Sequence, residues 1–292
     1  MSWRSQLSVK RMKFWRSLLP LALVCSVSSI GADVLAQTAD ETSIELVDPN
    51  VLRVCADPRN LPFSNEAGQG FENKIAELLA QKLGKSLAYE YYPGATGFLR
   101  NTLNAHRCDV VMGMPQGDDS VQGTNPYYRT TYALVSKAGA GLEAIDSLED
   151  QRLQTKKIGI VAGTPPATNL AINGLLGNLK SYPLVVDTRF DAPTRSMIED
   201  LQEDRIDVAI LWGPIAGYFA KQSKTPLKVT PLIKETTGPR MIYRIGMGVR
   251  HSDQEWKRLL NKMIADNQAE ITRILIDYGV PLLDENNGSV TH

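Results

Sequence analysis

The chain has 292 residues, of which 43% are hydrophobic and 22% charged, and its 32 basic side chains balance its 32 acidic ones. A chain of this length is long enough to form one large domain or two smaller ones with independent cores. Such a composition lacks the concentrated basic charge of a nucleic-acid-binding protein, so we expect no nucleic-acid partner.

The first 36 residues have the pattern of a secretory signal peptide. Basic residues precede an apolar run over 18–30, which is short for a helix that spans a bilayer, and Val34-Leu35-Ala36 offers a small-residue cleavage site. We therefore predict cleavage near Ala36 and a periplasmic location, with an uncleaved anchor as the alternative. Cleavage would leave 27 basic and 31 acidic residues, a formal charge of −4.

The mature chain begins with alternating strands and helices. Apolar runs predict strands over 51–56, 87–92 and 110–114 and helices over 71–83 and 98–105. The strand over 110–114 has no polar alternation, as expected where helices cover both faces of a sheet.

A second set of strands and helices follows, and two further segments end the chain. The predicted ranges are strands over 157–161, 184–186 and 206–211, a helix from about 166, a helix over 192–201, strands over 227–232 and 243–249, and a helical stretch over 254–277. Strands that alternate with helices indicate α/β lobes with mainly parallel sheets.

The last strand and the helical tail cannot build a third lobe, so we expect them to return to the first. We predict the α/β bilobal periplasmic-binding-protein fold of type II, with a signal peptide over 1–36, lobe 1 over 48–136 plus 237–292, and lobe 2 over 137–236. The chain would cross between lobes near 133–137 and near 231–240. Two connecting segments make a hinge, and hinge closure buries a ligand.

Two cysteines, Cys55 and Cys108, remain after cleavage. Cys55 lies well along the first strand, whereas Cys108 opens its parallel neighbour. If the strand ends are level, the sulfurs lie about 10 Å apart, which exceeds the span of a disulfide. A bent edge or another register would close this gap, so a disulfide and two buried thiols both stay open.

Ligands of open α/β sheets sit beyond the carboxyl ends of the strands. The topology therefore predicts a set of ligand-binding residues: Asp57, Arg59, Asn60, Phe63, Glu72, Met114, Gln116, Tyr127, Arg129, Gly163, Thr164 and Trp212.

Each candidate also has a structural interpretation. Asp57 can cap a turn, Trp212 can plug the core, and Tyr127 with Arg129 can hold the hinge. The Gly163-Thr164 segment precedes a helix whose free N–H groups could hold an anion, but it could equally be an ordinary helix start.

The mature chain resembles the type II solute-binding proteins, a class that includes polar amino-acid binders. In those binders, the resemblance implies, a Thr-x-x-Arg segment after the third strand grips the α-carboxylate, and an acid after the last strand of the second lobe meets the ammonium group. Here Met114-Pro115-Gln116-Gly117-Asp118-Asp119 and Trp212 occupy these places. We therefore do not expect a free amino acid as the ligand.

Four segments of the first lobe resemble the quinoprotein-dehydrogenase-associated binding proteins of the MoxJ/XoxJ type. They are Cys55–Asn65, Gly70–Ala76, Cys108–Pro115 and Pro126–Arg129. The resemblance implies a monomeric periplasmic accessory protein of a pyrroloquinoline-quinone (PQQ)-dependent methanol or other alcohol dehydrogenase. Such a protein would bind the dehydrogenase, its cytochrome c or a small ligand.

Two other functions stay open. One is an ABC-importer receptor for a small polar or aromatic solute, and the other is an enzyme on the same fold with Glu72 as the base. The three histidines of the mature chain do not follow predicted strands, so we expect no enzyme. We also expect no cofactor or metal, because the acidic clusters at 118–119 and 284–287 lack the spacing of a calcium loop.

Overall fold

The structure, a computed structural model, describes residues 45–184, 186 and 192–290. The predicted signal peptide lies outside these residues. Within the described part of the chain, no helix has both the length and the apolar character needed to cross a membrane.

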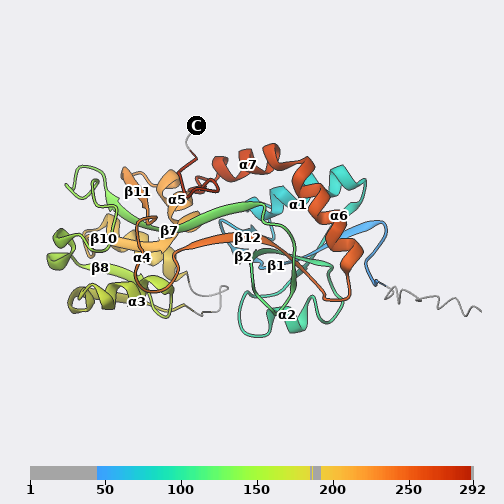
Figure 1. Cartoon of the computed structure of the whole chain (residues 1–292), viewed down its shortest axis with the longest axis horizontal. Coiled ribbons are helices and arrows are strands. Elements are labelled where there is room, and N and C mark those ends of the chain that lie inside the picture. The colour runs from blue at the N-terminus through green and yellow to red at the C-terminus, as the bar shows by residue number, and fades with distance from the viewer. Residues whose placement is uncertain (1–44, 185, 187–191, 291–292) are drawn as a thin grey trace, which may run out of the picture. The chain divides into compact units, whose positions relative to one another are not determined.

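A continuous path of hydrogen-bonded strands runs through the molecule in the order β4-β1-β5-β12-β7-β10-β8-β9 (Figure 1). These strands are β1 (Val51–Ala56), β4 (Ser86–Tyr91), β5 (Val110–Pro115), β7 (Tyr128–Lys137), β8 (Ile158–Val161), β9 (Leu179–Tyr182), β10 (Val208–Trp212) and β12 (Ile242–Val249). The shorter β2 (Arg59–Asn60) pairs with β3 (Ser64–Asn65), β6 (Gln122–Gly123) pairs with β12, and β11 (Leu227–Pro231) pairs with β7.

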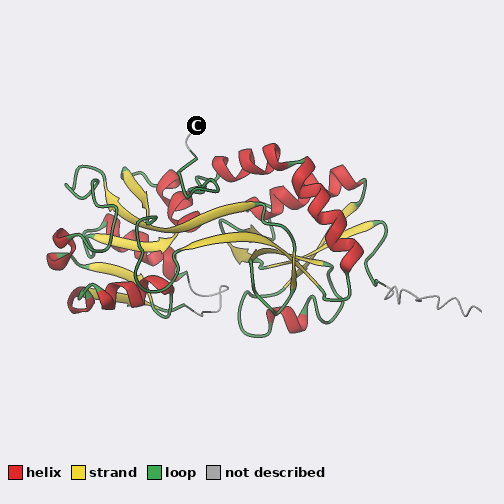
Figure 2. Cartoon of the chain, viewed as in Figure 1, coloured by secondary structure: helices red, strands yellow, loops and turns green. Residues whose placement is uncertain are grey.

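Helices pack around the strands at both ends of this path (Figure 2). They are α1 (Phe71–Leu83), α2 (Phe98–Asn101), α3 (Pro165–Ile172), α4 (Pro193–Gln202), α5 (Gly213–Gln222), α6 (Gln254–Asp266) and α7 (Gln268–Asp277), with 3₁₀ turns at Gln151–Thr155 and Leu176–Asn178.

Two groups of parallel strands define two lobes. In the first, β1 lies parallel to β4 and β5, and in the second, β8 lies parallel to β9 and β10. The first core joins Phe71 and Ile75 of α1 to Trp256 of α6, while separate apolar clusters pack around Ile158 and Met197 in the second. The predicted bilobal α/β fold is confirmed, and we retain the predicted lobe boundaries as a proposal.

Two strands join the lobes. The first part of β7 pairs with β12 as far as Thr131, and from Tyr132 onward β7 pairs with β10 and β11. The chain therefore changes lobe within one strand, slightly earlier than the predicted crossing. It returns through the segment between β11 and β12.

Three predicted elements differ in the structure. The second strand of the second set is β9, which pairs with β8 from Leu179 and so lies earlier than the predicted range 184–186, of which residue 185 lies outside the described residues. The predicted helix over 98–105 is a single turn, because the Thr102 hydroxyl donates to the Phe98 carbonyl at 2.7 Å and competes with further helix formation. The tail helix breaks at Asn267, whose side chain donates to the Met263 carbonyl at 2.8 Å.

Cys55 and Cys108 form a disulfide, with their Cα atoms 5.4 Å apart. The predicted register is present, since Cys55 lies opposite Val111, but the expected separation was wrong. Cys108 precedes β5 and packs with Leu103 and Val121 in a small apolar cluster that also contains Cys55. The chain before β5 therefore does not continue straight along the strand direction, and the two sulfurs meet.

A buried carboxylate anchors the first lobe. Asp109 is fully buried before β5 and accepts hydrogen bonds from Arg53 Nε and Arg250 Nη2, both at 2.7 Å. The Trp256 indole donates to the Asp109 carbonyl at 3.0 Å, so α6 is tied to the same point. The hydrogen bond from the Asp109 carboxylate raises the pKa of Arg53.

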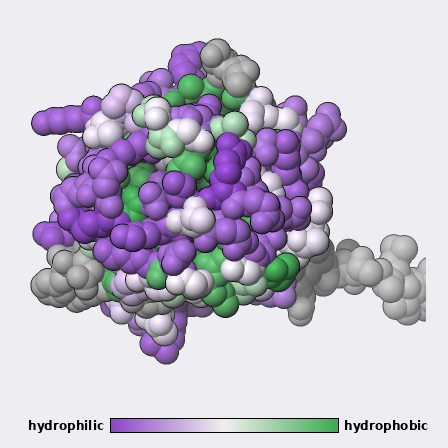
Figure 3. Space-filling model, turned by 90° about the vertical axis from the view of Figure 1, so that its left-hand side faces the viewer, coloured by the Kyte–Doolittle hydropathy of each residue, from purple (hydrophilic) through white to green (hydrophobic). Residues whose placement is uncertain are grey.

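The outer end of the molecule formed by β8, β10 and α3 is mainly hydrophilic (Figure 3). Its exposed large apolar side chains include Ile172 and Leu176, which are 55% and 58% exposed. Scattered apolar side chains of this kind are normal on soluble domains.

Candidate ligand cleft

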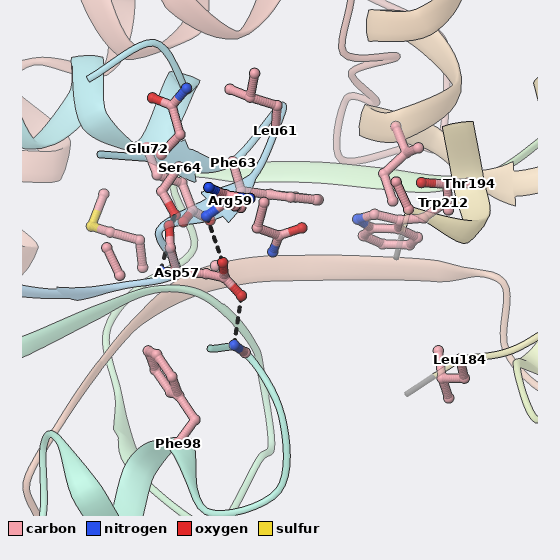
Figure 4. A pocket seen from close by; sticks show the side chains of 18 of the residues that line it. Asp57, Arg59, Leu61, Phe63, Ser64, Glu72, Phe98, Leu184, Thr194 and Trp212 are labelled. Atoms are coloured by element: carbon pink, nitrogen blue, oxygen red, sulfur yellow. Dashed lines mark hydrogen bonds between the residues drawn. The ribbon is translucent and has the colours of Figure 1, made fainter. Parts of the chain in front are cut away.

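A cleft of about 1070 Å³ lies between the two lobes. Residues after β1, at the start of α1 and at the end of β5 form one wall, and residues after β8, around α4 and at the end of β10 form the other. Figure 4 shows Asp57, Arg59 and Phe63 on one side, with Trp212 and Thr194 opposite them. The cleft thus lies at the strand ends, as the topology predicts.

Asp57 organises the loop of the first wall. Its carboxylate accepts from the backbone N–H groups of Arg59 at 2.7 Å and Gly94 at 2.5 Å, while the Ser64 hydroxyl donates to its carbonyl at 2.8 Å. The bond to Arg59 is the local turn that Asp side chains commonly form. Asp57 is therefore a turn cap that also lines the cleft.

Glu72 lies in the first turn of α1 and also lines the cleft. Its carboxyl oxygen rests against Gly113 of β5, where any larger side chain would collide with it. Burial, followed by the nearby negative charge of Asp57, raises the pKa of Glu72 to about 8. At neutral pH this carboxyl is therefore mostly protonated and can donate a hydrogen bond.

Three aromatic rings from both connecting strands and from β10 meet at the cleft. The Trp212 ring lies 5.0 Å from Tyr132 and 5.6 Å from Tyr243, both in edge-to-face contact. Burial raises the pKa of Tyr132 to about 12, so its hydroxyl keeps its proton. Trp212 thus packs in an aromatic cluster and still presents a surface to the cleft.

The start of α3 offers few free N–H groups to the second wall. The first two residues of α3 are Pro165 and Pro166, which have no N–H group, and the N–H of Ala167 already donates to the Thr164 carbonyl at 3.0 Å. The Thr164 hydroxyl donates to the Val161 carbonyl at 2.6 Å. Thr164 lines the cleft and Gly163 is not among its described lining residues, and binding of an anion by this segment stays a prediction.

Eight of the predicted residues line the cleft: Asp57, Arg59, Asn60, Phe63, Glu72, Met114, Thr164 and Trp212. Their contact with a ligand stays a prediction. Tyr127 is buried in the core, where its hydroxyl accepts from the Gly113 N–H at 3.2 Å. Gln116 and Arg129 line a different groove.

Sequence reasoning missed several lining residues, including Tyr132, Tyr243, Phe98, Thr194 and Arg195. The two tyrosines lie within strands instead of at strand ends, so the strand-end rule overlooked them. Alternation along β7 could have found one of them, since Tyr132 follows Tyr128 by four residues and faces the same side.

Two α/β lobes joined by two strands around a cleft define a bilobal binding protein. The chain belongs to the bacterial extracellular solute-binding proteins of family 3, whose family description matches residues 52–279.

Known proteins sharpen this assignment. The periplasmic binding protein XoxJ from Methylobacterium extorquens AM1 is 42% identical, with a TM-score of 0.69 over 80% of this chain and 100% of that one. Protein MoxJ of Paracoccus denitrificans is 28% identical over 88% of this chain and 96% of its own length. The predicted MoxJ/XoxJ-like resemblance is thereby confirmed.

A more distant relative is the arginine-binding extracellular protein ArtP of Bacillus subtilis, 26% identical over 80% of this chain and 87% of its own. Met114 and Trp212, which stand where the resemblance to amino-acid binders implies charged groups, both line the cleft and are uncharged. Among the described lining residues, the cations are Arg59 and Arg195, and both are exposed.

Proposed function

We propose that the protein is a periplasmic accessory binding protein of a PQQ-dependent methanol or related alcohol dehydrogenase. The observation that carries the proposal is the 42% identity to XoxJ across the whole length of that chain. The four first-lobe segments that resemble this group surround the first wall of the cleft. Membership in a solute-binding family favours binding over catalysis.

The cleft supports a ligand other than a free amino acid. Its first wall offers Glu72, whose pKa is raised to about 8, beside the hydrogen-bonded Asp57, and its second wall offers the Trp212 ring. We propose that these residues, together with Phe63 and Met114, contact whatever enters the cleft. An apolar cleft with few polar groups is typical of specific binding sites.

A direct binding experiment tests the accessory role. The secreted chain without residues 1–36 is immobilised, and the PQQ-dependent methanol dehydrogenase of the same source is passed over it, with its cytochrome c in a separate run. We expect saturable binding of the dehydrogenase or the cytochrome. An unrelated periplasmic protein, passed over the same surface, gives the level of non-specific binding. If neither the dehydrogenase nor the cytochrome binds above that level, the proposal is wrong.

The cleft itself favours a second candidate, a receptor that delivers a small solute to an importer. A solute that binds the folded chain raises its unfolding temperature by mass action. A thermal-shift screen of polar and aromatic solutes, repeated with Trp212→Ala, separates the candidates. A Trp212-dependent rise with no dehydrogenase binding would favour the receptor.

A further inference from the structure

A second groove, of about 880 Å³, lies on the other side of the two strands that join the lobes. Side chains alternate along β7 and β12, so Tyr128, Tyr132 and Tyr243 line the cleft while Arg129 and Arg244 line this groove. Arg240, just before β12, lines it as well. We call this surface, defined by Arg129, Arg240 and Arg244, the arginine groove.

Two of these arginines are forced together by the strand register. Arg129 lies directly opposite Arg244 in the antiparallel pair. The Arg129 carbonyl accepts from Leu283 and the Arg244 carbonyl from Gln116, both at 2.9 Å, so neither bonds to the facing strand. Side chains approach closest at such a non-hydrogen-bonded pair. Like charges placed directly opposite are destabilising, which indicates a role for them outside folding.

Within the described residues, these arginines have no carboxylate partner. No carboxylate of the described chain forms an ion pair with Arg129, Arg240 or Arg244, whereas several surface cations elsewhere do so. Arg129 Nη1 donates to the Glu285 carbonyl at 3.1 Å, but its buried Nε has no acceptor, and Asn287 Oδ1 has no donor. Buried polar groups are normally paired, so these two atoms are exceptions at the base of the groove, and the exposed part of each guanidinium is what a partner could reach.

Arg240 lies at the edge of the groove. Its guanidinium lies 4.5 Å from the centre of the ring of Tyr243, which lines the cleft, so this contact holds Arg240 where the two faces of β12 meet. Planar guanidinium groups pair with carboxylates through two parallel hydrogen bonds. The three arginines therefore suit carboxylate groups presented side by side.

The remaining charges of the groove indicate what kind of anion fits. Asp118 and Asp119 line it too, and Asp118 Oδ1 accepts from the Ser120 N–H at 2.9 Å. These two carboxylates would repel a compact, multiply charged anion such as phosphate. An extended peptide avoids that repulsion, because it can set its acidic side chains against the arginines and neutral ones against Asp118 and Asp119.

We propose that the arginine groove is the docking surface for a carboxylate-rich segment of the partner protein. This inference rests on the proposed accessory function, whose partner it locates on the surface facing away from the cleft. A segment bound there contacts β7 and the start of β12 together. Because β7 crosses between the lobes and the returning segment leads into β12, docking acts directly beside the hinge.

Hexaglutamate peptide with a fluorescent label is the probe for the first test, read by anisotropy at low and physiological salt. The Arg240→Glu/Arg244→Glu variant should bind it more weakly by about tenfold or more, because charge reversal replaces attraction by repulsion. The Lys224→Glu/Lys228→Glu variant makes the same change of charge at exposed positions outside the groove and should bind as the wild type does. If the first variant does not fold, Arg240→Gln/Arg244→Gln should show a smaller loss in the same direction.

The same variants are then tested against the dehydrogenase and its cytochrome. If the wild type binds a partner and the arginine variant binds it equally well, the inference is overturned and the proposed function stands. If neither protein binds the wild type but hexaglutamate binds in an arginine-dependent way, the proposed function fails and the groove keeps its preference for acidic peptides. Equal hexaglutamate binding by all variants, or displacement of the peptide by inorganic phosphate, would overturn the inference.

Discussion

The two lobes are stabilised in different ways. The first contains the Cys55–Cys108 disulfide and the buried Asp109, whose partner Arg250 is only 6% exposed. The second has its own central acid, Asp200 of α4, but its partners Lys180 and Arg205 are 47% and 49% exposed. Removing one partner of a buried ion pair leaves the other charge without water or a counter-charge, whereas solvent screens the charges of an exposed pair. The two clusters should therefore contribute very differently to the free energy of unfolding.

The largest effect should come from Asp109→Ala. The change removes the carboxylate that Arg53 and the buried Arg250 share, and Arg250 keeps only its pair with Asp253. Breaking a buried ion pair from one side costs up to roughly 3–5 kcal/mol. Urea denaturation followed by tryptophan fluorescence measures the free energy of unfolding. Glu255→Ala, which breaks an exposed pair with Arg258, is the matched control and should change little. An equal effect of both variants would contradict the role of burial.

The disulfide should come next. Its two cysteines are separated by 53 residues in the chain, and losing such a cross-link costs about 2–4 kcal/mol. Cys55→Ser/Cys108→Ser should therefore lower the unfolding temperature, and dithiothreitol should lower that of the wild type but not that of the variant. A wild type that is insensitive to the reductant would rule out this contribution.

Asp200→Ala should have a smaller effect, about 1–2 kcal/mol, because water screens its pairs. Burial acts to raise the pKa of Asp200, but hydrogen bonds from Lys180, Tyr182 and Arg205 hold it well below its usual range. A lowered folded-state pKa gives stability that is present above the unfolded pKa and lost as the pH falls through the folded one. The wild type should thus lose this contribution in strong acid, and Asp200→Ala should not. A loss as large as that of Asp109→Ala would remove the contrast between the lobes.

Glu72→Gln tests the cleft wall through the pH dependence of stability instead of through stability at a single pH. The folded-state pKa of Glu72 is about 8, against an ordinary value of 4.5. Between these two pH values the folded chain keeps a proton that the unfolded chain has lost, so the stability of the wild type falls as the pH rises through this range. The variant has no such proton to lose, so its unfolding temperature should fall less over this range. Glu66→Gln, at an exposed position on the same wall, should follow the wild type. Parallel profiles for wild type and Glu72→Gln would contradict the raised pKa.

Local patterns predicted most of the elements, because they depend on short stretches of chain. The strand β1 and the helix α1 have the predicted bounds, and the resemblance of the first-lobe segments led to the correct family. The strand-end rule placed eight of the twelve candidates in the cleft. Tyr127 lies just before β7 and is buried in the core, and Arg129 lies on the face of β7 that turns away from the cleft, which the rule does not consider.

The sequence by itself determined the alternation of strands and helices, the return of the tail to the first lobe and the uncharged character of Met114 and Trp212 in the cleft. Tertiary structure alone decided that Cys55 and Cys108 meet, that Glu72 shares its environment with Asp57, and that Arg129 faces Arg244. These contacts join residues far apart in the chain. Their distances follow from strand register and from the path of the loops, which no local pattern contains.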